Sequence, residues 1–182
     1  MVKRNVWLVW AVVVVFALSL SACAASGGIT MPEREVPISI DSALEAQDLA
    51  MAGLMMGSVD WTEAQFSSLL TELMKANSGE NLPVETITAW FEPDQLYLQA
   101  QVKEGVLPAA FGTTLQLAGN LDVQDGVLVV DIEEAAAGPY TVTGAALAPI
   151  NAQINGALAN QPIGLPLDVM LDSGKLSLSM AQ

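Results

Sequence analysis

Carboxylates are the main reactive side chains in this sequence, which contains 20 aspartates and glutamates, one cysteine and no histidine. The absence of histidine excludes histidine-dependent triads, histidine-ligated zinc and histidine acid–base catalysis. Glu133 and Glu134 are adjacent on an expected strand, so their side chains point to opposite faces and cannot act together on one bond. Asp122 and Asp125 lie at the turn sequence QDG, where backbone geometry alone favours aspartate.

Two further roles for the carboxylates are open. Asp122, Asp125 and Asp131 could bind calcium, but they lack the spacing of a defined calcium loop, so solvated turn residues are the favoured interpretation. A carboxylate pair about 5 to 10 Å apart across a cleft could hydrolyse glycosides, yet no feature selects such a pair. No G-x-S-x-G, P-loop, G-x-G-x-x-G or S-x-x-K motif occurs downstream of Cys23. We expect a non-catalytic protein without metal or other cofactor, with a carboxylate-based hydrolase as the alternative.

Cys23, the only cysteine, follows an N-terminal export signal. Lys3 and Arg4 precede an apolar segment over 6–20, and small residues stand directly before the cysteine. The sequence LSAC, which ends at Cys23, resembles the lipobox of bacterial lipoproteins. That resemblance implies cleavage before Cys23 and a thioether bond from its sulfur to diacylglycerol, with fatty acyl chains such as palmitate holding the protein at a membrane.

A retained transmembrane anchor and a buried cysteine are the competing interpretations. The strongly apolar run is shorter than the roughly 20 residues that cross a bilayer, and serines occur from position 19. The sequence AASGG after Cys23 is typical of a flexible linker rather than of a core. We expect a signal peptide over 1–22, a flexible tether with lipidated Cys23 over 23–37, and a single domain over 38–182.

The net charge restricts the partners of the mature chain. The sequence carries 6 basic and 20 acidic residues, and removal of Lys3 and Arg4 leaves a net charge of about −16. Nucleic acid is therefore not expected as a partner, since phosphate binding requires clustered lysine and arginine. Anionic headgroups also repel such a surface. We expect attachment to the extracytoplasmic face of a bacterial envelope membrane through acyl chains on Cys23.

Two helices are expected before the strands. Ser42 to Glu45 has the form of a capping box, so a first helix is predicted over 43–56. A second helix begins after Thr62, which can cap with Gln65, while two aromatic residues occupy the positions of a hydrophobic staple. The staple residues are Trp61 and Phe66, and the predicted apolar face consists of Phe66, Leu69, Leu70, Leu73 and Met74.

From residue 85 onward, alternating apolar and polar residues predict antiparallel strands. These strands have one polar side, apart from the more apolar start of the fourth, so one covered face is expected for the sheet. The sequence thus predicts an α+β fold, in which an antiparallel sheet of about six strands packs two or three helices on one face. The expected strands are 85–91, 96–103, 113–124, 127–134, 165–171 and 175–180, with a third helix over 147–160.

The second and third predicted helices share a sequence pattern. Each ends in Ala-Asn, at positions 76–77 and 159–160, and is followed after four residues by Leu-Pro and a strand hairpin. One interpretation is a duplicated helix–hairpin unit that grips a shared sheet twice. The other is coincidence in a chain rich in Ala, Leu, Asn and Pro.

Three stretches of the domain resemble bacterial lipoproteins of the YpmS-like and LmeA-like kind, which are related in architecture to tubular lipid-binding proteins. The stretches are WTEAQFSSLL, VQDGVLVVDI and PINAQINGAL, within residues 58–182. Phe66 and Ser67 stand where those lipoproteins tend to have Leu and Asn. The resemblance implies a helix-gripped sheet that can hold a lipid, and it transfers no catalytic residue.

Methionine-rich helices suggest where such a ligand would bind. Flexible thioethers suit an adaptable apolar pocket between helices and sheet, although methionine also fills irregular cores. The candidate pocket residues are Met51, Met55, Met56, Phe66, Leu70, Met74 and Ile154. Trp90 stands on the polar side of its strand and is the candidate for an exposed partner contact.

Two functions follow as expectations. The first is non-catalytic binding of a lipid or other apolar envelope molecule. The alternative is a structural or scaffolding lipoprotein that engages an envelope protein through an acidic sheet face.

Overall fold

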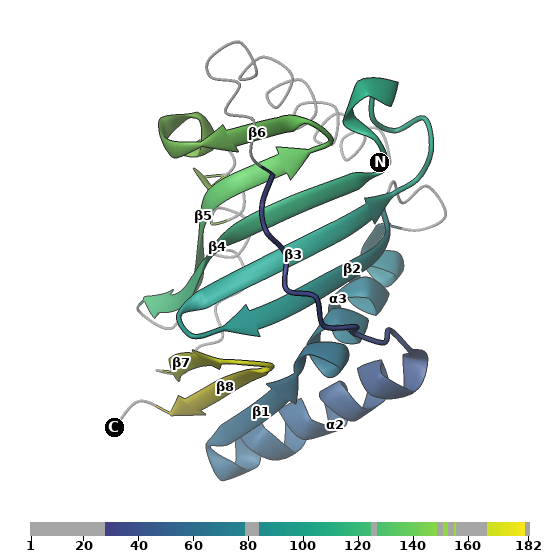
Figure 1. Ribbon diagram of the computed structural model, residues 1–182. Helices are drawn as coiled ribbons and strands as arrows, with labels where there is room; N and C mark the ends of the chain where they lie inside the picture. The colour runs from purple at the N-terminus through teal and green to yellow at the C-terminus, as the bar shows by residue number, and fades with distance from the viewer. Residues whose placement is uncertain are drawn as a thin grey trace, which may run out of the picture.

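The structure is a computed structural model that describes residues 28–78, 84–124, 127–148, 151–152, 155 and 167–180. It confirms the α+β prediction, with two antiparallel sheets in place of one (Figure 1). The helices are α2 (Ile40–Met56) and α3 (Glu63–Ser78). One sheet has the order β1 (Ser58–Thr62), β8 (Lys175–Met180), β7 (Leu167–Asp172). The other has the order β2 (Val84–Glu92), β3 (Gln95–Val102), β4 (Thr114–Gln124), β5 (Val127–Ala137), β6 (Tyr140–Thr143).

The meander from β2 to β5 follows the predicted strands within a few residues. Pro93 and Asp94 form the first turn, and Asp94 adopts a positive φ of 61°, which aspartate tolerates better than most residues. Between β4 and β5 the register shifts from Ala118 to Gly119, because Glu133 of β5 is an extra residue that forms a bulge opposite them. A Cβ at this glycine would lie 2.1 Å from the carbonyl oxygen of Asp131, so only glycine fits this close approach.

Two strands, β1 and β6, were not predicted from the sequence. β1 follows α2 directly and pairs with the C-terminal strand β8, from Ser58 opposite Ser179 to Thr62 opposite Lys175. β6 is four residues long and pairs with the end of β5. Both are short, and both pair with chain that is remote in sequence or lies across a tight turn, so the brief alternation in SVDWT and YTVT is not enough to predict a strand.

Helix α3 begins as its sequence predicts. The Thr62 N–H donates to Gln65 Oε1 at 2.9 Å, and the Gln65 N–H donates to Thr62 Oγ1 at 3.3 Å. The rings of Trp61 and Phe66 pack across this start, with centroids 6.1 Å apart. The capping box and the hydrophobic staple are therefore both confirmed.

Helix α2 begins three residues earlier than predicted, because Ser39 rather than Ser42 is its N-cap. The Ser39 hydroxyl accepts the Ser42 N–H at 3.1 Å. Gly57 ends the helix at φ 82°, a left-handed conformation that favours glycine. The chain then turns back along the helix, and the Trp61 indole N–H donates to the Ala46 carbonyl at 3.0 Å.

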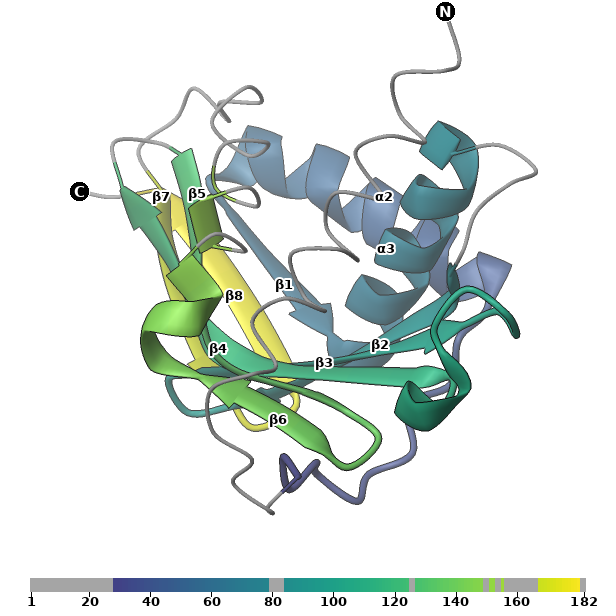
Figure 2. The same ribbon diagram turned by 90° about the horizontal axis from the view of Figure 1, so that it is seen from above.

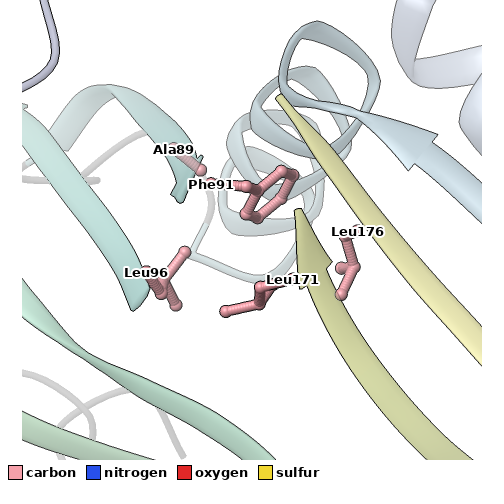
Figure 3. Packing of buried hydrophobic residues seen from close by; sticks show 5 residues of the cluster. All are labelled: Ala89, Phe91, Leu96, Leu171 and Leu176. Carbon is pink, nitrogen blue, oxygen red and sulfur yellow. The ribbon is translucent and has the colours of Figure 1, made fainter. Parts of the chain in front are cut away.

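The main core cluster joins the two sheets to α3. The Phe91 side chain points from β2 toward Leu171 and Leu176 of the three-stranded sheet (Figure 3). The Phe66 ring of α3 packs edge-on against Phe91, with centroids 5.3 Å apart. Ala89 and Leu96 complete the buried set, so the face of the five-stranded sheet that packs here, the inner face, is covered at this end.

A second cluster lies on the inner face near β5 and β6. Leu147 ends the short helix η3 (Gly144–Leu147) and packs against Val130, Ile132 and Val142. Residues 148, 151, 152 and 155 are helical, in agreement with the third predicted helix. The rest of its predicted range lies outside the described residues.

The segment over 28–39, here called the strap, crosses the outer face of the five-stranded sheet, opposite α2 and α3 (Figures 1 and 2). Ile29 is only 8% exposed and packs against Ala118 and Ala136. The expectation of a flexible tether is therefore wrong for 28–37, while 23–27 lie outside the described residues. The outer face is also partly covered, contrary to the expectation of one covered face, because strap side chains bury the apolar positions of that face.

Candidate functional site

Three side chains of α3 cover the edge of β2 that pairs with no other strand. Glu63 Oε1 accepts the Phe91 N–H at 2.8 Å. The Ser67 hydroxyl accepts the Ala89 N–H at 2.8 Å and lies 3.4 Å from the Ala89 carbonyl oxygen, to which it donates. The Thr71 hydroxyl does the same at Ile87, with distances of 3.0 and 3.2 Å. The helix therefore supplies the hydrogen bonds that another strand would make, which removes an exposed sheet edge.

Two asparagines cover the free part of β5 in the same way. Asn151 Oδ1 accepts the Ile132 N–H at 2.8 Å, and its Nδ2 donates to the Ile132 carbonyl at 3.0 Å. Asn155 makes the equivalent pair with Val130, with both distances 2.9 Å. β6 pairs with β5 only over residues 134–137, so these carboxamides continue the edge where β6 does not reach.

The spacing of both sets has a geometric cause. Four residues of α-helix rise about 6 Å, while two residues of strand rise about 6.7 Å. Side chains at i and i+4 can therefore meet alternate residues of an antiparallel strand: Ser67 and Thr71 meet Ala89 and Ile87, as Asn151 and Asn155 meet Ile132 and Val130. This shared geometry supports the interpretation that the two helices grip the sheet by the same device.

The most buried face of α3 is not the apolar face that the sequence predicts. Ser67 has 0% exposure, whereas Leu73 is 45% exposed. The reason is that the hydroxyls must reach the β2 backbone, which places their face nearest the sheet edge. The missed signal was the i, i+4, i+8 spacing of Glu63, Ser67 and Thr71.

Between the two gripped edges, the inner face presents a floor of apolar side chains that are only half-buried. Ile87, Ala100 and Leu115 stand opposite one another on β2, β3 and β4 and therefore share this face. Leu98 and Leu117 form the next row toward the core, and both pack against the buried clusters. We call the first row, from Ile87 to Leu115, the apolar floor.

Helix α3 borders the apolar floor with two of the predicted pocket residues. Leu70 and Met74 follow Phe66 at helical spacing and are half-buried. Phe66 is half-buried as well and packs against the main core cluster. Thr71 fixes this part of the helix to Ile87, one of the floor residues.

The other predicted pocket residues are not brought together. Met51 and Met56 are 62% and 79% exposed on α2, which contradicts their assignment to an interior pocket. The buried side of α2 is formed by small residues, Ala43, Ala46 and Gly53, because the helix packs closely on α3 and β1. The Met55 side chain and Ile154 lie outside the described residues.

Trp90 is not the exposed contact that alternation predicts. It is 7% exposed, and its indole N–H donates to the Arg34 carbonyl of the strap at 2.8 Å. Nor is the outer face acidic at its centre, where two rows across β2, β3 and β4 are uncharged. These rows are Thr86, Gln101 and Thr114, and Thr88, Gln99 and Gln116. Trp90 is thus buried and the two central rows are neutral, while Asp122 and Asp131 are exposed on the part of this face nearer β5.

Arg34 links the strap to the edge of β2. Its guanidinium donates to Glu63 at 2.7 Å, to Glu92 at 2.5 Å and to the Phe91 carbonyl at 3.0 Å. Hydrogen bonds to Glu63, and then to Glu92, raise the pKa of Arg34 above its ordinary value. Lys75 and Lys175 also form ion pairs, so three of the four basic residues downstream of Cys23 are neutralised locally.

Three of the carboxylates considered from the sequence, Asp122, Asp131 and Glu133, are exposed. Glu133, the extra residue of the bulge in β5, is exposed and accepts the Asn120 side-chain N–H at 3.1 Å. Asp122 is exposed and accepts the Val123 N–H. Asp125 lies outside the described residues. Among those described, no group of three or more Cys, Asp or Glu residues is placed to hold a metal ion.

None of the helices within the described ranges is long and apolar enough to cross a bilayer.

Comparison with known proteins identifies no relative. No family model, no curated protein and no solved structure matches this chain. The resemblance to YpmS-like and LmeA-like lipoproteins therefore stays a prediction, and the gripped sheet with its apolar floor is the feature on which a function can be argued.

Proposed function

We propose that this chain is a membrane-anchored, extracytoplasmic bacterial lipoprotein that binds a lipid or another apolar envelope molecule and catalyses no reaction. Acyl chains on Cys23 attach it, because a net charge of about −16 offers no electrostatic attraction to anionic headgroups. The ligand lies between α3 and the inner face of the five-stranded sheet.

The observation that supports ligand binding is the half-buried apolar floor. Ile87, Ala100 and Leu115 share one face, and α3 borders them with Leu70 and Met74. The edges beside this floor are fixed by hydrogen bonds from α3 and from Asn151 and Asn155. A preorganised apolar surface can bind an acyl chain without the entropy cost of ordering the protein first.

Matched substitutions on one strand test the binding site. Leu115→Asp places a charge on the floor, and Thr114→Asp places the same charge on the opposite face of β4. We expect Leu115→Asp to weaken binding of a fluorescent fatty-acyl probe at least about tenfold, which is about 1.4 kcal/mol, and Thr114→Asp to leave it within about twofold. Equal effects, or no co-purifying lipid by mass spectrometry and no probe binding to the unaltered protein, would contradict the proposal.

A separate experiment tests attachment. Cells expressing the full chain are fed a clickable palmitate analogue, and the protein is followed through membrane fractionation. We expect the label and the membrane association in the unaltered chain and neither in Cys23→Ser. Label retained by Cys23→Ser would overturn the proposed anchor.

A further inference from the structure

The strap is fastened to the domain at several points along its length. Ile29 is buried on the outer face, and the Arg34 side chain and carbonyl bond to Glu63, Glu92 and Trp90. The Ser39 N–H donates to the buried Ser68 hydroxyl at 3.1 Å. From Ile29 onward, the chain is thus held to the folded domain.

This fastening leaves very little chain between the domain and Cys23. Five residues separate Cys23 from Ile29, so six Cα–Cα steps join them. At the reach of about 3.5 Å per residue of extended chain, Ile29 lies at most about 21 Å from Cys23. A tether that was free as far as residue 37 would reach more than twice as far.

We infer that the strap is a mount that holds the outer face of the five-stranded sheet beside the headgroups of the leaflet in which Cys23 is anchored. The partner of this surface is the bilayer itself, and the region around Ile29 and Trp90 is the part of the domain nearest to it. The inference rests on the proposed anchoring at Cys23. It adds that the distance between the domain and the leaflet in which Cys23 is anchored is limited by the short tether.

Electrostatics set how the mounted domain sits. Surface charges are screened over about 8 Å at physiological ionic strength, which is well within the reach of the tether. Repulsion between the acidic domain and anionic lipids therefore disfavours flat contact, while the covalent tether limits the separation. The short tether and the repulsion together hold the outer face close to the headgroups without adsorbing it.

Natural residues make this geometry measurable. Cys23 is the only thiol of the mature chain, over 23–182, so a maleimide lipid in a vesicle couples only there. Trp61 and Trp90 are its only tryptophans. Trp90 lies under the strap, whereas Trp61 packs against the core cluster on the inner side of the sheet. Trp61→Phe and Trp90→Phe leave one emitter each, and dansyl-labelled headgroups accept the energy.

We expect energy transfer to the headgroups to be at least about twofold more efficient from Trp90 than from Trp61. A flexible insert of 20 Gly and Ser residues between Ser26 and Gly27 raises the maximum span from Cys23 to Ile29 from about 21 Å to about 91 Å. This insert should lower transfer from Trp90 by at least half. The same insert after Gln182 is the matched control and should leave the transfer unchanged.

Releasing the strap should act like lengthening the tether. Ile29→Asp with Met31→Asp puts charges against Tyr97 and Ala118, so the strap is expected to leave the sheet and Trp90 transfer to fall. Circular dichroism and a cooperative thermal transition of this double variant check that the domain remains folded.

Equal transfer from both tryptophans, or transfer from Trp90 that the insert does not change, would overturn the mount. Because the lipid is coupled chemically, this result is independent of whether cells acylate Cys23 and of whether the floor binds a ligand. Failure of the proposed function would instead be seen in palmitate labelling and probe binding.

Discussion

The two edges of the five-stranded sheet are covered by the same geometry but by different chemistry. On β2, α3 offers one carboxylate and two hydroxyls, and each makes one or two hydrogen bonds to the β2 backbone. On β5, two carboxamides reach the strand. A carboxamide carries a donor and an acceptor on separate atoms and so replaces a complete peptide group, whereas a hydroxyl must serve both roles with one oxygen.

This difference explains why only the β2 edge depends on the strap. An ionised carboxylate accepts but cannot donate, so Glu63 satisfies the Phe91 N–H and leaves the Phe91 carbonyl without a partner on α3. That carbonyl accepts instead from Arg34 and from the Gly174 N–H at 2.9 Å. The two carboxamides thus satisfy both backbone groups of each residue that they meet on β5. On β2, the Phe91 carbonyl needs donors from the strap and from the β7–β8 turn.

Removing the carboxylate should therefore have the largest effect on stability. Glu63→Ala leaves the Phe91 N–H without its acceptor and removes the more buried of the two carboxylates that pair with Arg34. Breaking a buried pair costs about 3 to 5 kcal/mol, and we expect about 3 because Arg34 is 39% exposed and can reach water. Urea unfolding measures it. Glu92→Ala removes the more exposed partner of Arg34 and should cost less than about 1 kcal/mol; equal losses would contradict a special role for Glu63.

Changing a carboxamide to a carboxylate should damage the other edge. In Asn151→Asp the new oxygen replaces a donor that faces Asp131 Oδ1 at 2.8 Å and the Ile132 carbonyl at 3.0 Å. We expect a loss of about 2 kcal/mol at pH 7, measured by urea unfolding. The loss should shrink below about pH 4, where a protonated carboxyl can donate again. Asn120→Asp makes the same change on an exposed pair with Glu133 and is the control. A pH-independent loss would show that Asn151 does not act through its donor.

A single hydroxyl should matter less than either charge change. Ser67→Ala leaves the buried Ala89 N–H without an acceptor but introduces no charge, so we expect a loss of about 1.5 kcal/mol. Thermal unfolding followed by circular dichroism measures it. Ser42→Ala, whose hydroxyl bonds only the exposed Ser39 hydroxyl, should change stability by less than about 0.5 kcal/mol. Equal melting temperatures for the two variants would contradict a stabilising role for the α3 hydroxyls at the β2 edge.

The features predictable from sequence are those with local causes. The cap of α3 involves residues three positions apart, and each hairpin of the meander joins neighbouring strands, so their patterns survive in the sequence. Trp90 was mispredicted because strand alternation places it on a polar face, and its burial comes from Arg34, 56 residues away. Likewise, Ser67 and Thr71 look like surface residues until the β2 edge is beside them. The polar i, i+4 spacing on α3 was present in the sequence, but apolar periodicity outweighed it.

The ion pair of Asp60 with Lys175 is an exposed reference for the pair of Arg34 with Glu63, and it should have the smallest effect. Hydrogen bonds from Lys175 and then Ser177 lower the pKa of Asp60. A lowered pKa in the folded state adds stability above the unfolded pKa, near 3.9, and that stability is lost as the pH falls through the folded pKa. Asp60→Asn should therefore lower the free energy of unfolding slightly at pH 7, by less than about 0.5 kcal/mol, because both side chains are largely exposed. The difference should shrink as the pH falls through the folded pKa of Asp60, where this side chain also becomes neutral. At pH 7, 1 M salt should reduce it because exposed charges are screened. A difference that does not shrink on acidification, or that exceeds the loss in Glu63→Ala, would contradict this order of the two pairs.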